Sequence, residues 1–243
     1  MGLVGAAHRA YLQQMAGLIA QNGLANADNR DTDGDTFDDS PIAGLARSLT
    51  MTVLRQLDGS RKGHVAQFLA QSGLIKNKGV AVVNLYGADL RDAVLFDAFL
   101  SNTSFIGADL QGADLRYSWI DGANFTSADL RDTNLAYTAY DPKGVQRSYF
   151  DASCLTGARF TAADLPDASF DGAHGSDVDF SKASLTGGDF TDAVLMDVEA
   201  AGTKYGAATP KTFPPGWGRR GLSKQIYEDQ PGPCDDLDIA ESP

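Results

Sequence analysis

The chain has 243 residues, of which 43% are hydrophobic, and it carries a formal net charge of −12 at pH 7. This length is enough for one large domain with appendages, and no stretch approaches the roughly 20 apolar residues of a membrane span. The negative charge argues against direct binding of nucleic acid, because such binding rests largely on the neutralisation of phosphates by Lys and Arg.

Two further features bear on the cellular compartment. Residues 1–7 are apolar but lack both a charged segment ahead of them and a cleavage site, so no signal peptide is predicted. The two cysteines, Cys154 at an outward position and Cys234 near the end, are too few for a disulfide framework and suit a reducing compartment. We therefore expect a cytoplasmic protein.

The first third of the chain follows helical rules. Apolar residues recur on one face over residues 8–21 and again over 42–57, which predicts two amphipathic helices. A third helix is predicted to start with Asp58 or Ser60 as its N-cap and to stop at Gly73. Its buried residues are predicted to be Val65, Phe68 and Leu69.

An acidic loop, residues 28–40, joins the first two of these helices. Its beginning has the oxygen spacing of an EF-hand loop. The candidate calcium ligands are Asn29, Asp31, Asp33 and Asp35. The bidentate acid expected at the twelfth position is missing, since Ser40 stands there. We favour a solvated linker without metal, with calcium binding as the alternative.

From Leu85 to Leu195 every fifth residue is apolar, with Gly175 as the single break. A small residue stands two positions before most of these. A five-residue period fits neither a helix nor a strand, so every unit must contain a turn. Positions two apart in an extended segment share a face, so the small and the large residue both point inward. Such units must stack to bury their apolar side, which predicts a solenoid.

The same units carry a family resemblance. Residues 88–92, 108–112 and 128–132 read Ala-Asp-Leu-Arg-Asp, Ala-Asp-Leu-Gln-Gly and Ala-Asp-Leu-Arg-Asp. They resemble the signature A-(D/N)-L-x-x of the pentapeptide-repeat family, which implies a mainly β fold, a right-handed quadrilateral β-helix with four units in each coil. Residues 55–69 also resemble the segment that precedes the repeats in one bacterial subgroup of this family, which implies an N-terminal α-helical cap.

We therefore divide the chain into three parts. Residues 1–79 form the helical cap region, residues 80–205 the solenoid, and residues 206–243 a C-terminal cap segment with an acidic tail. Phe213 and Trp217 are the candidates to cover the last coil.

Four units per coil would stack residues twenty apart. Leu115, Leu135 and Leu155 would then share one column. At Gly175 the column loses its large side chain, so it either narrows or is filled by a neighbour.

A second irregularity lies at residues 141–146. Lys143 stands where a small inward residue belongs, and Pro142 cannot donate a ladder hydrogen bond. We expect this corner to bulge outward. Simple decay of the repeat and a functional loop are both open explanations.

Catalysis finds no support in the sequence. The histidines His8, His64 and His174 lie in different segments, and no nucleophile, metal-ligand or phosphate-binding spacing is present. Asp89 and its equivalents recur by repeat position and are expected to hydrogen-bond their own turns. We predict no enzyme and no cofactor.

The remaining signal is the charge of the repeats. Residues 83–205 contain 19 acidic against 8 basic residues. This predicts an acidic rigid rod that acts as a protein-interaction module for a partner with a basic groove. The candidate binding residues are Asp89, Asp92, Asp109, Asp129 and Asp132. The family resemblance adds an alternative, a DNA mimic that binds or protects DNA gyrase or topoisomerase. The identity of the partner and the oligomeric state stay open.

Overall fold

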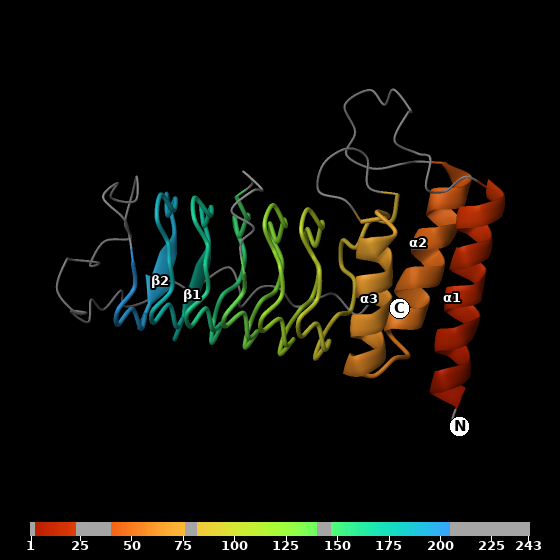
Figure 1. The fold of residues 1–243 in the computed structure, drawn as a ribbon, viewed down its shortest axis with the longest axis horizontal. Coiled ribbons are helices and arrows are strands. Elements are labelled where there is room, and N and C mark those ends of the chain that lie inside the picture. The colour runs from red at the N-terminus through yellow and green to blue at the C-terminus, as the bar shows by residue number, and fades with distance from the viewer. Residues whose placement is uncertain (1–2, 23–39, 76–81, 140–146, 205–243) are drawn as a thin grey trace, which may run out of the picture.

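The fold comes from a computed structural model, which describes residues 3–22, 40–75, 82–139 and 147–204. The three helices are α1 (Leu3–Asn22), α2 (Pro41–Leu54) and α3 (Gly59–Gln71). The two short strands are β1 (His174–Ser176) and β2 (Val194–Met196). Figure 1 shows the helices together at one end, with the coils following one another away from them. The calcium candidates and residues 206–243, including Phe213 and Trp217, lie outside the described residues.

The helices begin and end where their capping residues direct. The Ser40 hydroxyl accepts a hydrogen bond from the Ala43 amide (3.2 Å), and Asp58 accepts one from the Arg61 amide (3.0 Å). Asp58 is therefore the N-cap of α3. Gly73, with a φ of 68°, turns the chain after the helix, as predicted.

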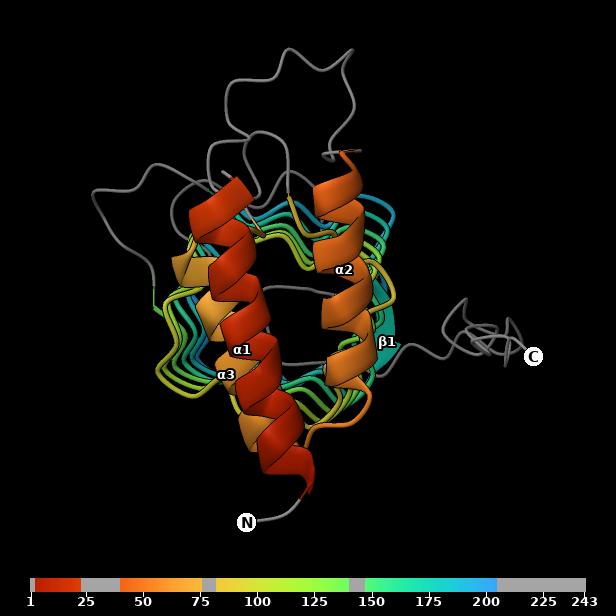
Figure 2. The ribbon, with the colours of Figure 1, turned by 90° about the vertical axis from the view of Figure 1, so that its right-hand side faces the viewer.

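Helix α3 lies directly against the first coil, with α1 outermost (Figures 1 and 2). Two glycines make this close approach possible. A Cβ atom added to Gly59 would overlap the carbonyl oxygen of Asp92, and one added to Gly63 would overlap that of Val94. The helix backbone therefore touches the coil backbone without intervening side chains.

The same contact covers the open edge of the solenoid. The first coil has no preceding coil to accept its amide hydrogen bonds, so it presents an unpaired edge. The Val94 amide donates to the Gly59 carbonyl (2.9 Å), and the Ser104 amide donates to the Ile75 carbonyl (2.7 Å). The cap thus satisfies part of the edge with its own backbone.

Beyond the cap, the coils form a β-helix solenoid held by parallel bridges. Asp89 pairs with Asp109, and Asp109 with Asp129, which are twenty residues apart. A left-handed residue makes each turn, for example Asp92 (φ 56°) and Gly112 (φ 68°). Within the described residues the alanines and the large apolar residues of the five-residue register are buried, apart from Leu195, which is partly buried. The inward pattern predicted from the sequence is confirmed.

The sequence separation between bridged residues changes once along the solenoid. Across the interval 140–146 the bridged residues are twenty-five apart instead of twenty. The pairs are Asn124 with Tyr149, Asp129 with Cys154, and Asn134 with Arg159. One whole unit is therefore left out of the ladder. Because this unit is five residues long, the inward positions keep their direction on both sides.

This shift corrects the predicted columns. The Leu135 amide donates to the Arg159 carbonyl (2.7 Å), so Phe160 follows Leu135 in its column. Leu155 instead follows Leu130. The predicted single column through Leu115, Leu135 and Leu155 is therefore wrong. That prediction assumed that every unit takes part in the ladder. A unit containing Pro142 and Lys143 is poorly suited to do so.

The corrected register creates a continuous aromatic column in the core. Adjacent rings along it are nearly parallel, with centroids between 4.7 and 5.2 Å apart. Its members are Phe105, Phe125, Phe150, Phe170 and Phe190, all of them buried.

Gly175 lies in β1, which pairs in parallel with β2. A Cβ atom at Gly175 would lie 2.6 Å from the Thr156 amide nitrogen and 2.7 Å from the Leu155 carbonyl carbon. The Gly175 backbone therefore packs directly against the backbone of the preceding coil, and a larger residue would not fit at this position.

Candidate interaction surface

The repeated aspartates hold their own turns, as the sequence predicted. The carboxylate of Asp89 accepts from the Arg91 amide (3.2 Å), and that of Asp109 accepts from the Gln111 amide (3.2 Å). Asp129 does the same with Arg131 (3.1 Å). Each carboxylate thus fixes the start of the next corner.

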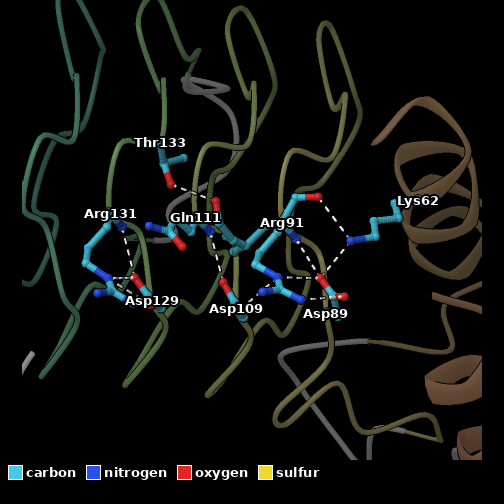
Figure 3. A network of polar contacts seen from close by, with 9 residues as sticks. Lys62, Asp89, Arg91, Asp109, Gln111, Asp129, Arg131 and Thr133 are labelled. Atoms are coloured by element: carbon cyan, nitrogen blue, oxygen red, sulfur yellow. Dashed lines mark hydrogen bonds and ion pairs between the residues drawn. The ribbon is translucent and has the colours of Figure 1, made fainter. Parts of the chain in front are cut away.

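Two of the five candidate binding residues, Asp89 and Asp109, belong to an ion-pair network, and a third, Asp129, pairs with Arg131 (Figure 3). The Arg91 guanidinium lies between Asp89, at 3.1 Å, and Asp109, at 3.4 Å. The Lys62 ammonium of α3 lies 2.6 Å from Asp89 and is itself buried. This network joins the cap to the first two coils, so part of the acidic charge is neutralised internally.

The network separates the pKa values of two neighbouring carboxyls. Burial alone would raise the pKa of Asp89, but hydrogen bonds and charge from Arg91 and Lys62 outweigh it and lower this pKa to about 2. Burial raises the pKa of Asp109, and the nearby charge of Asp129 adds to the rise. Asp89 and Asp109 are bridged partners in adjacent coils, yet they respond to pH with opposite sign.

This difference gives a pH prediction. Since the folded pKa of Asp89 lies below its ordinary value, its contribution to stability is present above that value and is lost as the pH falls from about 4 to about 2. The stability advantage of the unaltered protein over Asp89→Asn should therefore shrink across this range. The stability advantage of the unaltered protein over Asp109→Asn should instead grow as the pH falls, because the raised pKa of Asp109 favours the folded state in acid. Urea denaturation of the three proteins measures both trends, and parallel curves would contradict the assignment.

The other two candidates, Asp92 and Asp132, lie at the left-handed turn position and are exposed. Their side chains lie over glycines of the next coil. The Asp92 carboxylate would meet a Cβ atom added to Gly112 at 2.7 Å, and the Asp132 carboxylate would overlap one added to Gly157. Asp177 and Asp197 are exposed at equivalent turns further along the rod.

Sequence reasoning missed a second surface feature, a group of exposed rings at one corner of three successive coils. Phe99 is 60% exposed, Phe96 50%, Tyr137 49% and Tyr117 46%, and Trp119 is partly exposed. We call these five residues the aromatic corner. Their signal in the sequence is that they are large and apolar but off the five-residue register.

The structure also brings histidines together that the sequence analysis placed apart. The rings of His8 on α1 and His64 on α3 stack at 6.0 Å. His174 Nε2 lies 3.4 Å from the sulfur of Cys154. Within the described residues no group of acidic, histidine and cysteine side chains is arranged to hold a metal ion.

Cys154 departs from its expected state. It lies at an outward ladder position, as predicted, but it is buried and disulfide-bonded, whereas the sequence suggested a reducing compartment. Disulfides persist mainly in oxidising compartments. Cysteine usage therefore gives no support to the cytoplasmic location, which stays a prediction. None of the described helices has the length and apolarity that crossing a bilayer requires.

Comparison with known proteins agrees with this geometry. The family described as pentapeptide repeats matches in eight copies, over residues 84–117, 108–138 and 153–202. This chain is a pentapeptide-repeat protein. The matched segments of this pentapeptide-repeat protein coincide with the coils on both sides of the register shift. No curated protein is significantly similar to the chain.

Several solved structures share the repeat. HetL, a pentapeptide repeat protein involved in heterocyst differentiation regulation in the cyanobacterium Nostoc, is 22% identical, with 51% of this chain and 73% of HetL covered and a TM-score of 0.28. QnrB1, a plasmid-mediated fluoroquinolone resistance protein, is 19% identical, with 51% and 70% covered and a TM-score of 0.30. A thylakoid-lumen pentapeptide repeat protein of Arabidopsis thaliana is 26% identical, with 47% and 69% covered and a TM-score of 0.23. The family assignment rests on the matched repeats.

Proposed function

We propose that this protein is a non-catalytic interaction module. It is an acidic rod with the right-handed quadrilateral β-helix of its family, and it binds a protein partner that has a basic groove. The observation that carries the proposal is the fixed column of exposed carboxylates at Asp92 and Asp132. They stand two coils apart, about 10 Å along the rod. Asp177 and Asp197 extend the acidic column toward the far end.

The column suits recognition because its geometry is set by the ladder. The Asp92 amide donates to the Gln111 carbonyl (2.9 Å), and the Asp132 amide donates to the Thr156 carbonyl (2.8 Å). The backbone at each turn is therefore held before any partner arrives, so little ordering entropy is lost on binding. Clustered charge of one sign also steers an oppositely charged surface toward the rod.

The ion-paired residues have a different role in this proposal. Asp89, Asp109 and Asp129 hold the turns and the cap, and their charges are partly neutralised by Arg91 and Arg131. A partner's basic residues would therefore meet Asp92 and Asp132 first.

A charge-neutralising pair of variants tests this assignment. Asp92→Asn/Asp132→Asn should weaken binding of an oligolysine peptide severalfold at low salt, because asparagine keeps the left-handed turn but loses the charge. Asp167→Asn/Asp192→Asn is the matched control, since both residues are also exposed and left-handed but lie at other corners. Equal loss in the two double variants, or no binding by the unaltered protein, would overturn the proposed site.

The alternative partner is DNA gyrase, with the acidic rod occupying the DNA-binding surface as a mimic. The net charge of −12 is compatible with it. A gyrase supercoiling assay, with and without a quinolone, distinguishes gyrase from another protein partner. It is titrated with the unaltered protein and with Asp92→Asn/Asp132→Asn. Inhibition or protection that is lost in the variant would identify gyrase or a related topoisomerase as the partner. No effect at low salt would exclude it and leave the interaction module with another protein partner.

A further inference from the structure

Four rings of the aromatic corner form two stacks that follow the ladder, and the fifth, Phe96, packs edge-on against Tyr117. The rings of Phe99 and Trp119 stack at 6.2 Å with an interplanar angle of 12°, and those of Tyr117 and Tyr137 at 5.0 Å with 4°. Phe99 and Trp119 are bridged partners in adjacent coils. The rings are therefore held in place by the backbone, as the carboxylates of the acidic column are.

Both stacks end on alanine. Trp119 is bridged to Ala139 in the next coil, and the Tyr137 amide donates to the Thr161 carbonyl (2.9 Å), which places Ala162 next to Tyr137. An alanine is too small to cover an aromatic face. One face of Trp119 and one of Tyr137 are therefore left without a stacking ring in the described coils.

A carboxylate lies one ladder step beyond the first of these alanines. The Asp164 amide donates to the Thr138 carbonyl (3.0 Å), so Asp164 follows Ala139 in the column of Trp119. Asp164 is exposed, and its carboxylate makes no hydrogen bond or ion pair with any described residue. Two ladder steps separate Trp119 from Asp164, about 10 Å. This spacing admits one planar cation between the indole face and the carboxylate.

The rod already contains such an arrangement within its own chain. The Arg116 guanidinium lies over the Phe96 ring, 5.6 Å from its centroid, and pairs with the Asp114 carboxylate at 2.6 Å. A guanidinium between a ring and a carboxylate is thus compatible with the corner geometry. Arginine suits this position better than lysine, because its planar group stacks on a ring while its N–H groups donate to the carboxylate.

We propose that Trp119, Ala139 and Asp164 form a slot that binds an arginine side chain of a basic protein partner. The inference rests on the proposed function and names the side chain that the partner inserts. Charge selects this occupant, since a second copy of the chain would bring another net charge of −12 against the rod. Cation–π attraction, rather than charge alone, then decides where on the acidic surface the partner sits.

Tryptophan fluorescence tests the slot in the full chain. The sequence has two tryptophans, so Trp217→Phe leaves Trp119 as the single reporter. An oligoarginine peptide should change its emission and bind about five- to ten-fold more tightly than an oligolysine peptide of equal length. Asp164→Asn should remove most of this preference for arginine. Circular dichroism and thermal midpoints confirm that each variant is folded.

Two further variants make the result specific. Phe99→Ala/Tyr137→Ala removes rings beside the slot and should reduce oligoarginine affinity severalfold, with little change for oligolysine. Tyr86→Ala removes an exposed ring at another corner and is the matched control, with no expected change. Severalfold weaker binding of both peptides by Asp92→Asn/Asp132→Asn, with the preference for oligoarginine retained, would separate the acidic column from the slot.

Three outcomes would overturn the slot. Equal affinity for the two peptides would show that charge alone binds them. An unchanged preference in Asp164→Asn would place the arginine elsewhere. A preference for arginine that is seen only in Lys143→Ala would show that the slot of the unaltered protein does not take the partner's arginine. None of these results contradicts the interaction module, which fails only if the acidic column is also without effect.

Discussion

Replacing Gly63 by alanine is expected to lower the free energy of unfolding by about 3 kcal/mol, at the upper end of what overpacking costs. The added methyl group would overlap the carbonyl oxygen of Val94, which is backbone and cannot rotate away. Helix α3 would have to move off the first coil. That movement would break the hydrogen bond from the Val94 amide to the Gly59 carbonyl, and it would lengthen the ion pair between Lys62 and Asp89. Urea denaturation followed by circular dichroism measures the loss.

Gly44 provides the matched control in the same cap. It lies in α2, and a Cβ atom there meets nothing within 4 Å. Alanine at this exposed helical position should stabilise the protein by roughly 0.5–1 kcal/mol, because glycine loses more backbone entropy on folding. Equal effects of Gly44→Ala and Gly63→Ala would show that α3 does not depend on backbone contact with the coil.

Truncation of Phe150 to alanine is expected to cost about 3–5 kcal/mol, since stacked coils cannot collapse around the cavity. The ring stacks between Phe125 at 5.2 Å and Phe170 at 4.7 Å, and it forms a T-shaped pair with Phe160. The control is Phe99→Ala, which removes a mostly exposed ring and should change stability by only about 0.5 kcal/mol.

A double-mutant cycle on Phe125 and Phe150 tests the twenty-five-residue register directly. Ring pairs in contact couple by about 0.5–1.5 kcal/mol beyond their burial. We expect coupling of this size between Phe125→Leu and Phe150→Leu. Additive effects would restore the twenty-residue register, in which Phe150 would stack on Leu130.

Much of the fold could be predicted because its rules are local. The five-residue register fixes which side chains point inward, and it holds in every described coil. Asp58 and Gly73 bound α3 through contacts within a few residues of the chain. The hydrogen bonds of the repeated aspartates to their own turns are local in the same way. Of the predicted interaction surface, the positions of the carboxylates along the rod followed from this periodicity.

The stacking register could not be predicted in the same way. Leaving one whole unit out of the ladder keeps every inward residue inward, so the pattern of apolar residues is the same for either register. Only the fit between coils decides whether Phe150 stacks on Phe125 or on Leu130. That fit depends on residues twenty or twenty-five apart, and it moved Leu155 out of the column of Leu135.

The sequence by itself therefore determined the inward register, the helix ends and the distribution of charge, because each depends on side chains close together in the chain. Only the tertiary structure decided which carboxylates are neutralised and which face water. Arg91 reaches Asp109 in the next coil, and Lys62 reaches Asp89 from α3. The aromatic corner likewise forms from rings twenty residues apart. Such contacts exist only once the coils are stacked and the cap is in place.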